Sequence, residues 1–208
     1  MTPAAPLADV VTDALTDVAS ALQTPVHVLA LALGLLLILE LGRAAAEAAR
    51  RLRPARPRLL AVAAGALADP GRAPEIARAA PGALTERAIR DMAEARATGR
   101  PEAVEDALAD YELGVQRRLD RTRMLVRAGP AVGLMGTLIP LGPGIAALGR
   151  GDVAALAGDL RTAFAATVIG ILVGTAAFAL TLVRTRIATE DLAALERAAR
   201  TSGEATGR

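Results

Sequence analysis

The sequence predicts an all-α integral membrane protein with three transmembrane helices and extended cytoplasmic helices. Three apolar segments, at residues 25–42, 128–149 and 162–183, are long enough as helices to cross about 30 Å of hydrocarbon. The chain is 53% hydrophobic but only 1% aromatic. Ala and Leu therefore carry the apolar content, which suits closely packed membrane helices better than a soluble core.

Composition also excludes several classes of site. The chain has no cysteine, so disulfides and thiolate metal sites are absent, and the single His27 rules out a site with several histidines. The net charge is only +2, which predicts no nucleic-acid partner. No paired carboxylates, nucleophile motif or phosphate loop stands out, so we expect neither an enzyme nor a bound metal or cofactor.

The N-terminal segment, residues 1–24, is predicted to be an amphipathic helix on the outer membrane surface. Its apolar residues recur on one side of a helix: Leu7, Val10, Val11, Leu15, Val18 and Leu22. The first transmembrane helix follows at residues 25–42. Its only charge is Glu40 near the inner end, which we expect to be an interfacial residue.

Residues 43–127 are predicted to form a cytoplasmic helical domain. A short apolar segment at 58–69 ends in Asp-Pro-Gly, and residues 83–97 repeat apolar side chains at helical spacing. Pro101 sits at a helix start followed by an acidic first turn. From there one helix could run unbroken into the second span.

The second transmembrane helix, residues 128–149, is unusual for its glycines. Gly129, Gly133 and Gly136 repeat at steps of four and three, which predicts a flat strip for close helix contact. Thr137 adjoins this strip. Pro140 and Pro143 are predicted to kink the helix, because proline removes a backbone donor and frees a carbonyl one turn earlier.

The third transmembrane helix, residues 162–183, repeats this pattern after an outer loop at 150–161. Gly170 and Gly174 belong to a second face of small residues, together with the hydroxyls of Thr162 and Thr167. Asp159 lies just before the span. A carboxylate there is either a solvated residue at a helix start or part of a polar path. Residues 184–208 are predicted to be a cytoplasmic C-terminal tail with an amphipathic helix.

Arginine placement predicts the orientation of the chain. Arginines cluster after the first span, before the second and after the third, whereas the N-terminal segment is acidic and the 150–161 loop is balanced. The positive-inside rule therefore puts the N-terminus outside and the C-terminus in the cytoplasm. We expect the protein to lie in the cell (inner) membrane of a bacterium or an archaeon.

Two functions remain open from these residues. Hydroxyls at membrane depth can order water for a proton relay where charges would be too costly, which makes Thr137, Thr167, Thr162 and Asp159 candidates for a proton pathway. Small faces and back-bonded threonines are also common in helices that only pack. The alternative is therefore a non-conducting oligomeric membrane scaffold for a partner protein.

Two stretches resemble a known family. Pro130 and the run Gly-Leu-Met-Gly-Thr-Leu-Ile at 133–139 resemble the "P-x-x-GLLGT-h-h" signature of the MotA/TolQ/ExbB proton-channel family. Residues 159–171 resemble that family's "GIxxALxxTxxGL" stretch, with Thr167 and Gly170 at its positions. The long segment between the first and second spans fits the same family.

The resemblance implies a homo-oligomer, a pentameric ring of helices around the single-span helices of a small partner. That partner carries an aspartate in its membrane helix, and proton flow past it drives work at the cell envelope. Thr137 and Thr167 match the two pore-facing threonines. Thr162 stands where the transport branch has a glutamate, so the chain resembles a divergent branch; whether it carries protons or sodium stays open.

Overall fold

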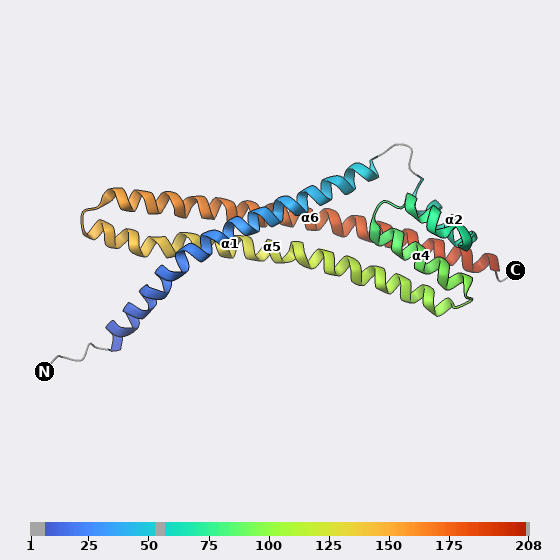
Figure 1. The fold of residues 1–208 in the computed structure, drawn as a ribbon, viewed down its shortest axis with the longest axis horizontal. Coiled ribbons are helices and arrows are strands. Elements are labelled where there is room, and N and C mark those ends of the chain that lie inside the picture. The colour runs from blue at the N-terminus through green and yellow to red at the C-terminus, as the bar shows by residue number, and fades with distance from the viewer. Residues whose placement is uncertain (1–6, 53–56, 207–208) are drawn as a thin grey trace. The chain divides into compact units, whose positions relative to one another are not determined.

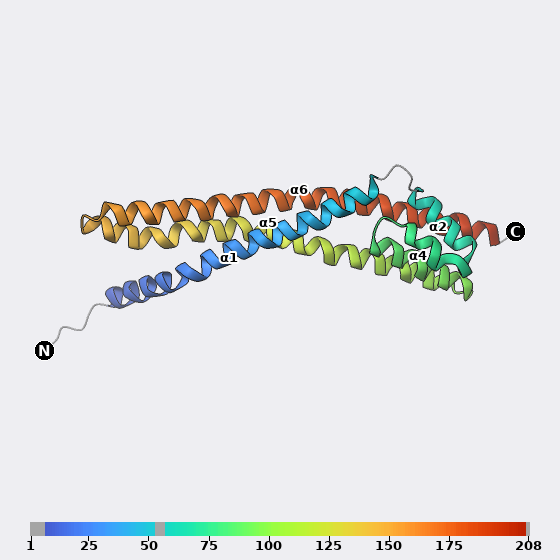
Figure 2. The ribbon, with the colours of Figure 1, turned by 45° about the horizontal axis from the view of Figure 1, so that its top comes forward.

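A computed structural model of the chain describes residues 7–52 and 57–206. The described residues are helical apart from short connections, with no strand among them (Figures 1 and 2). In chain order the elements are α1 Leu7–Arg51, α2 Leu59–Ala68, η1 Pro70–Arg72, α3 Ala73–Ile76, η2 Ala77–Ala79, α4 Ala83–Ala97, α5 Pro101–Gly149 and α6 Val153–Thr206. Parts of the predicted segments 1–24, 43–127 and 184–208 lie outside the described residues, at 1–6, 53–56 and 207–208.

Three of these helices are long and apolar enough to cross a membrane. They are found within Ala14–Arg51, Glu102–Gly149 and Val153–Gly203. Each contains one of the three apolar segments predicted from the sequence. The fold is thus an all-helical membrane architecture with three candidate spans.

The N-terminal segment is not separate from the first span. Helix α1 continues through Pro25 without an end. One proline removes a single backbone donor and leaves the neighbouring bonds of the helix in place, so the expected boundary at residue 25 is not a helix end.

The expected outer loop at 150–161 is much shorter in the structure. Helix α5 ends at Gly149 and α6 begins at Val153, so residues 153–161 are helical. Two local features explain this early start. Gly151 adopts φ +80°, a conformation that favours glycine, and the Asp152 carboxylate accepts the amide of Ala155 at 2.9 Å as an N-cap.

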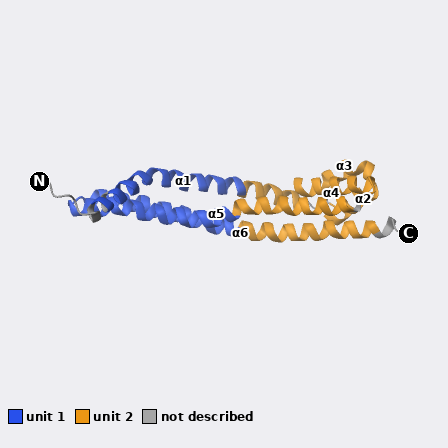
Figure 3. Ribbon diagram, turned by 90° about the horizontal axis from the view of Figure 1, so that it is seen from below, with its two compact units in different colours: residues 1–40, 123–179 blue, residues 41–122, 180–208 orange. Residues whose placement is uncertain are grey.

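The chain divides into two compact units (Figure 3). Unit 1 comprises Met1–Glu40 and Arg123–Ala179, and unit 2 comprises Leu41–Thr122 and Leu180–Arg208. The core of unit 1 is built from three helices, and α1 contributes Val26, Ala30, Leu33 and Leu37. Their spacing of three and four residues puts all four on one face of the helix.

Unit 2 has its own apolar core. Helices α2, α3 and α4 supply most of it, and α5 and α6 contribute further residues, among them Tyr111 and Leu195. Ile89 and Met92 of α4 are fully buried there. Helix α4 spans the same residues as the helix predicted from the sequence, and α5 starts at the predicted Pro101.

Candidate functional site

The predicted packing glycines lie where α5 and α6 approach each other closely in unit 1. A Cβ added to Gly170 would lie 2.5 Å from the carbonyl oxygen of Gly129 and 2.7 Å from the Cα of Gly133. Real Cβ atoms do not approach backbone this closely. The two backbones are therefore in direct contact, and only glycine fits between them.

The same close approach continues in both directions along the hairpin. A Cβ on Gly136 would lie 2.5 Å from the Cβ of Ala166, and one on Gly174 would lie 2.8 Å from the ring of Pro130. Small residues on both helices are therefore what allows this spacing, as expected for membrane helices without a hydrophobic driving force between them.

Thr167 makes a polar contact across this interface. Its hydroxyl, on α6, donates to the backbone carbonyl of Gly133 on α5 at 3.2 Å, and the side chain is half-buried. In an α-helix the amide of residue i+4 donates to the same carbonyl, and that residue is Thr137. The Gly133 carbonyl therefore joins the Thr167 hydroxyl to the backbone of Thr137.

The other two predicted hydroxyls are bonded within their own helices. Thr137 donates to the carbonyl of Leu134 at 2.7 Å, and Thr162 donates to that of Gly158 at 3.2 Å. Thr137 is half-buried and Thr162 is exposed. A threonine oxygen that donates its hydrogen to a carbonyl still has lone pairs that accept hydrogen bonds.

Asp159 lies in the second turn of α6, where its side chain is half-buried against the end of α5. Its Oδ2 atom is 3.6 Å from the position that a Cβ on Gly144 would take. The carboxylate therefore packs beside α5, one helical turn before the hydroxyl of Thr162.

Pro140 and Pro143 lie inside α5, which continues to Gly149. Pro140 is almost fully buried. Because neither proline has an amide hydrogen, the carbonyls of Gly136 and Ile139 receive no helical hydrogen bond from them. The kink predicted at these prolines stays a prediction.

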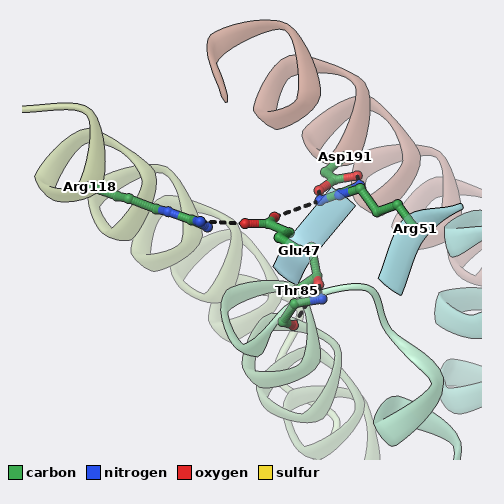
Figure 4. A network of polar contacts seen from close by, with 6 residues as sticks. Glu47, Arg51, Thr85, Arg118 and Asp191 are labelled. Carbon is green, nitrogen blue, oxygen red and sulfur yellow. Dashed lines mark hydrogen bonds and ion pairs between the residues drawn. The ribbon is translucent and has the colours of Figure 1, made fainter. Parts of the chain in front are cut away.

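A second polar cluster, in unit 2, was missed by the sequence analysis. Glu47 of α1 accepts hydrogen bonds from Arg51 of the same helix, at 3.2 Å, and from Arg118 of α5 (Figure 4). Arg51 also makes two hydrogen bonds to Asp191 of α6, at 3.0 and 2.6 Å. The spacing Glu47–Arg51 is the i,i+4 signal that could have indicated part of this cluster.

The environment of Glu47, which lies beyond the apolar segment 25–42, favours its charged form. Burial by itself would raise the pKa of this carboxyl. The hydrogen bonds and positive charges of Arg118 and Arg51 together outweigh burial, so the pKa of Glu47 lies below its ordinary value. Arg51 and Arg118 belong to the clusters that predict orientation, and in the structure they also join helices to one another.

The structure also changes the picture of Glu40. We expected an interfacial side chain, but Glu40 is buried in unit 1, with 6% of its surface exposed.

Among the residues that the structure describes, no group of three or more His, Cys, Asp or Glu side chains could hold a metal ion.

The fold and the site define a multi-pass helical membrane protein with hydroxyl groups at a close contact between two spans. The model of the MotA/TolQ/ExbB proton channel family matches residues 77–196. This match covers more than half of the chain, and the chain belongs to that family. No match was found among the curated proteins or among the solved structures.

Proposed function

We propose that the protein is a stator-like proton-channel subunit. With a single-span partner that carries an aspartate in its membrane helix, it uses the proton-motive force to energise work at the cell envelope. The observation that carries this proposal is the Thr167 hydroxyl bonded to the Gly133 carbonyl next to Thr137. This contact lies within the family match and within two apolar spans.

Oxygen atoms gather around this contact in a segment that carries no charge. The hydroxyls of Thr137 and Thr167 can accept hydrogen bonds from water, and the Gly136 carbonyl that Pro140 leaves without a helical donor is another acceptor. Such groups order water for proton transfer at a lower cost than buried charges. Thr162 and Asp159 continue the pathway, and the partner's carboxylate supplies the titratable group that the missing glutamate would provide.

The proposed assembly is a pentameric ring in a bacterial or archaeal cell membrane. The N-terminus lies outside, the turn at 150–152 also lies outside, and unit 2 and the C-terminus are cytoplasmic. Large apolar side chains on the surface of unit 1, among them Leu134, Leu138 and Phe164, are more than half exposed in one chain. Because these side chains are exposed in a single chain, we expect lipid or neighbouring copies to cover them in the membrane.

Proton uptake into vesicles tests the proposal. The protein would be co-expressed with the product of the adjacent gene, and uptake would be followed with a pH-sensitive dye. Thr137→Val with Thr167→Val should abolish uptake, because valine keeps the shape and removes the hydroxyl. Thr175→Val is the matched control, an exposed threonine of the same α6 span outside the pathway, and should leave uptake unchanged.

The same assay identifies the ion and can reject the proposal. Replacing sodium by potassium should not change the flux through a proton channel. Wild-type uptake in the double valine variant would overturn the assignment of the pathway.

A non-conducting membrane scaffold is the second candidate, and one observation favours it. The hydroxyls of Thr137, Thr162 and Thr167 all donate to backbone carbonyls, which is what threonines with only a packing role also do. A scaffold predicts no flux in any variant, while the partner still co-purifies. An adjacent gene for a single-span protein with a membrane-embedded aspartate favours the channel.

A further inference from the structure

The last part of α1 in unit 2, together with Leu52 just after the helix, makes up residues 41–52 and is attached in an unusual way. We call this segment the α1 arm. None of its residues belongs to the apolar core of unit 2 or is among the partly buried apolar residues packed against that core. Ala44, Glu47 and Arg51 are half-buried, and the rest of the arm is exposed, with Leu52 at 81%. Apolar burial therefore contributes little to holding the arm.

Polar contacts hold the arm instead. Arg51 binds Asp191 of α6 with its two terminal nitrogens, Nη1 at 3.0 Å and Nη2 at 2.6 Å, and the Asp191 side chain is only 8% exposed. Glu47 is bound by Arg118 of α5 on the other side. The arm is thus joined to two helices through one continuous chain of charges, Arg118–Glu47–Arg51–Asp191 (Figure 4).

The surface beneath the arm is not closely packed. A cavity of about 90 Å³ lies there, and both the arm and the facing helices line it, the latter with Tyr111 of α5 and Leu180 and Ile187 of α6. The Arg51 Nε atom is buried without a hydrogen-bond partner, which costs free energy. Protein interiors are normally close-packed, so this contact is less closely packed than a core contact.

We propose that the α1 arm is a latch held by ion pairs, which detaches from α5 and α6 when one charge of the network is removed or screened, while the core of unit 2 stays folded. The attachment of the arm and the folding of the core are separable because the core contains no residue of the arm. Local opening of such weakly packed segments, with free energies below that of global unfolding, is common in proteins. This inference does not depend on the proposed function.

The chain carries its own probe for this opening. Tyr111 is the single tyrosine of a chain without tryptophan, it lines the cavity beneath the arm, and it is 5% exposed. Opening of the latch should make Tyr111 accessible to acrylamide, which quenches tyrosine fluorescence. Amide hydrogen exchange of residues 41–52 reports the arm itself, and exchange of residues 88–93 of α4 reports the core.

The experiment compares the purified full-length protein with two variants that each remove one charge, Asp191→Asn and Arg118→Gln. In 0.1 M salt each should speed exchange of the arm by roughly 10- to 100-fold, as expected for losing a hydrogen bond to a charged group. Exchange in α4 should not change. The control is Glu190→Gln, which removes an exposed ion pair with Arg186 that lies within α6 alone.

A second measurement uses the wild-type protein and needs no substitution. Because part of the network is accessible to solvent, 1 M salt should screen its charges. Amide hydrogen exchange of the α1 arm should then be faster in the wild-type protein, and acrylamide should quench the fluorescence of Tyr111 more strongly. Unchanged exchange of the arm in both variants and in high salt would overturn the proposal. Equal acceleration of the arm and of α4 would also overturn it, because the arm would then not open separately.

Discussion

Close contact between α5 and α6 predicts a strong effect of adding one methyl group. In Gly170→Ala the new Cβ would lie 2.5 Å from the Gly129 carbonyl oxygen and 2.9 Å from the amide nitrogen of Gly133. These are backbone atoms, so no side chain can rotate away to make room. The two helices themselves must separate.

The size of the effect follows from these distances. Ordinary contact begins at 3.4 Å, so the helices must separate by about 0.9 Å at this point. A gap of that size forfeits a quarter to a half of each dispersion contact along the face, and overpacking of this kind typically costs about 1–3 kcal/mol. The Thr167 hydroxyl, now 3.2 Å from the Gly133 carbonyl, would move out of hydrogen-bonding range.

Thermal unfolding in detergent, followed by circular dichroism at the helix band, measures this cost. The matched control is Gly158→Ala in the same helix, where an added Cβ meets nothing within 4 Å. Both substitutions gain the same intrinsic helix propensity, so their difference isolates the contact. We expect Gly170→Ala to be less stable than Gly158→Ala by about 1–3 kcal/mol. Equal stability of the two variants would refute the close approach.

Three further predictions concern other parts of the chain. Gly151→Ala should destabilise the turn between α5 and α6 by about 1–2 kcal/mol, measured as a lower Tm, because φ is +80° there. Ile89→Ala should cost about 2–5 kcal/mol in chemical unfolding, because Ile89 is fully buried in unit 2. Glu47→Gln should lower the Tm at neutral pH. Since the pKa of Glu47 is lowered by folding, its stabilisation is present above the ordinary value of 4.5. The difference in Tm between wild type and variant should therefore shrink as pH falls below that value; a difference independent of pH would contradict this.

Local patterns were sufficient for most helices. Proline and glycine punctuation around Asp69 and Pro101 marked where helices end and begin, because these residues act through the backbone alone. The loop predicted at 150–161, which was the stretch between two uncharged apolar segments, is too long. Charged residues such as Asp159 and Arg161 mark the end of an apolar segment but not the end of a helix, and the N-cap at Asp152 starts α6 before them.

The candidate site was only partly predictable. Periodic glycines on both spans indicated two faces that pack closely, and the structure puts them against each other. Which acceptor each hydroxyl uses depends on the register between the helices, and periodicity within one helix contains no information about that register. The contact of Thr167 with the Gly133 carbonyl is therefore decided only by the tertiary structure.

The sequence by itself determined the class of this protein: three apolar segments, their small faces and the family signature are all local properties of the chain. Tertiary structure decided which charges are paired. Arg51, Arg118 and Asp191 are far apart in the sequence. The residues next to each of them along the chain have the composition of an ordinary solvated helix face. Only the packing of α1, α5 and α6 in unit 2 brings Arg51 to Asp191 and Arg118 to Glu47, since an ion pair depends on separation in space and not along the chain.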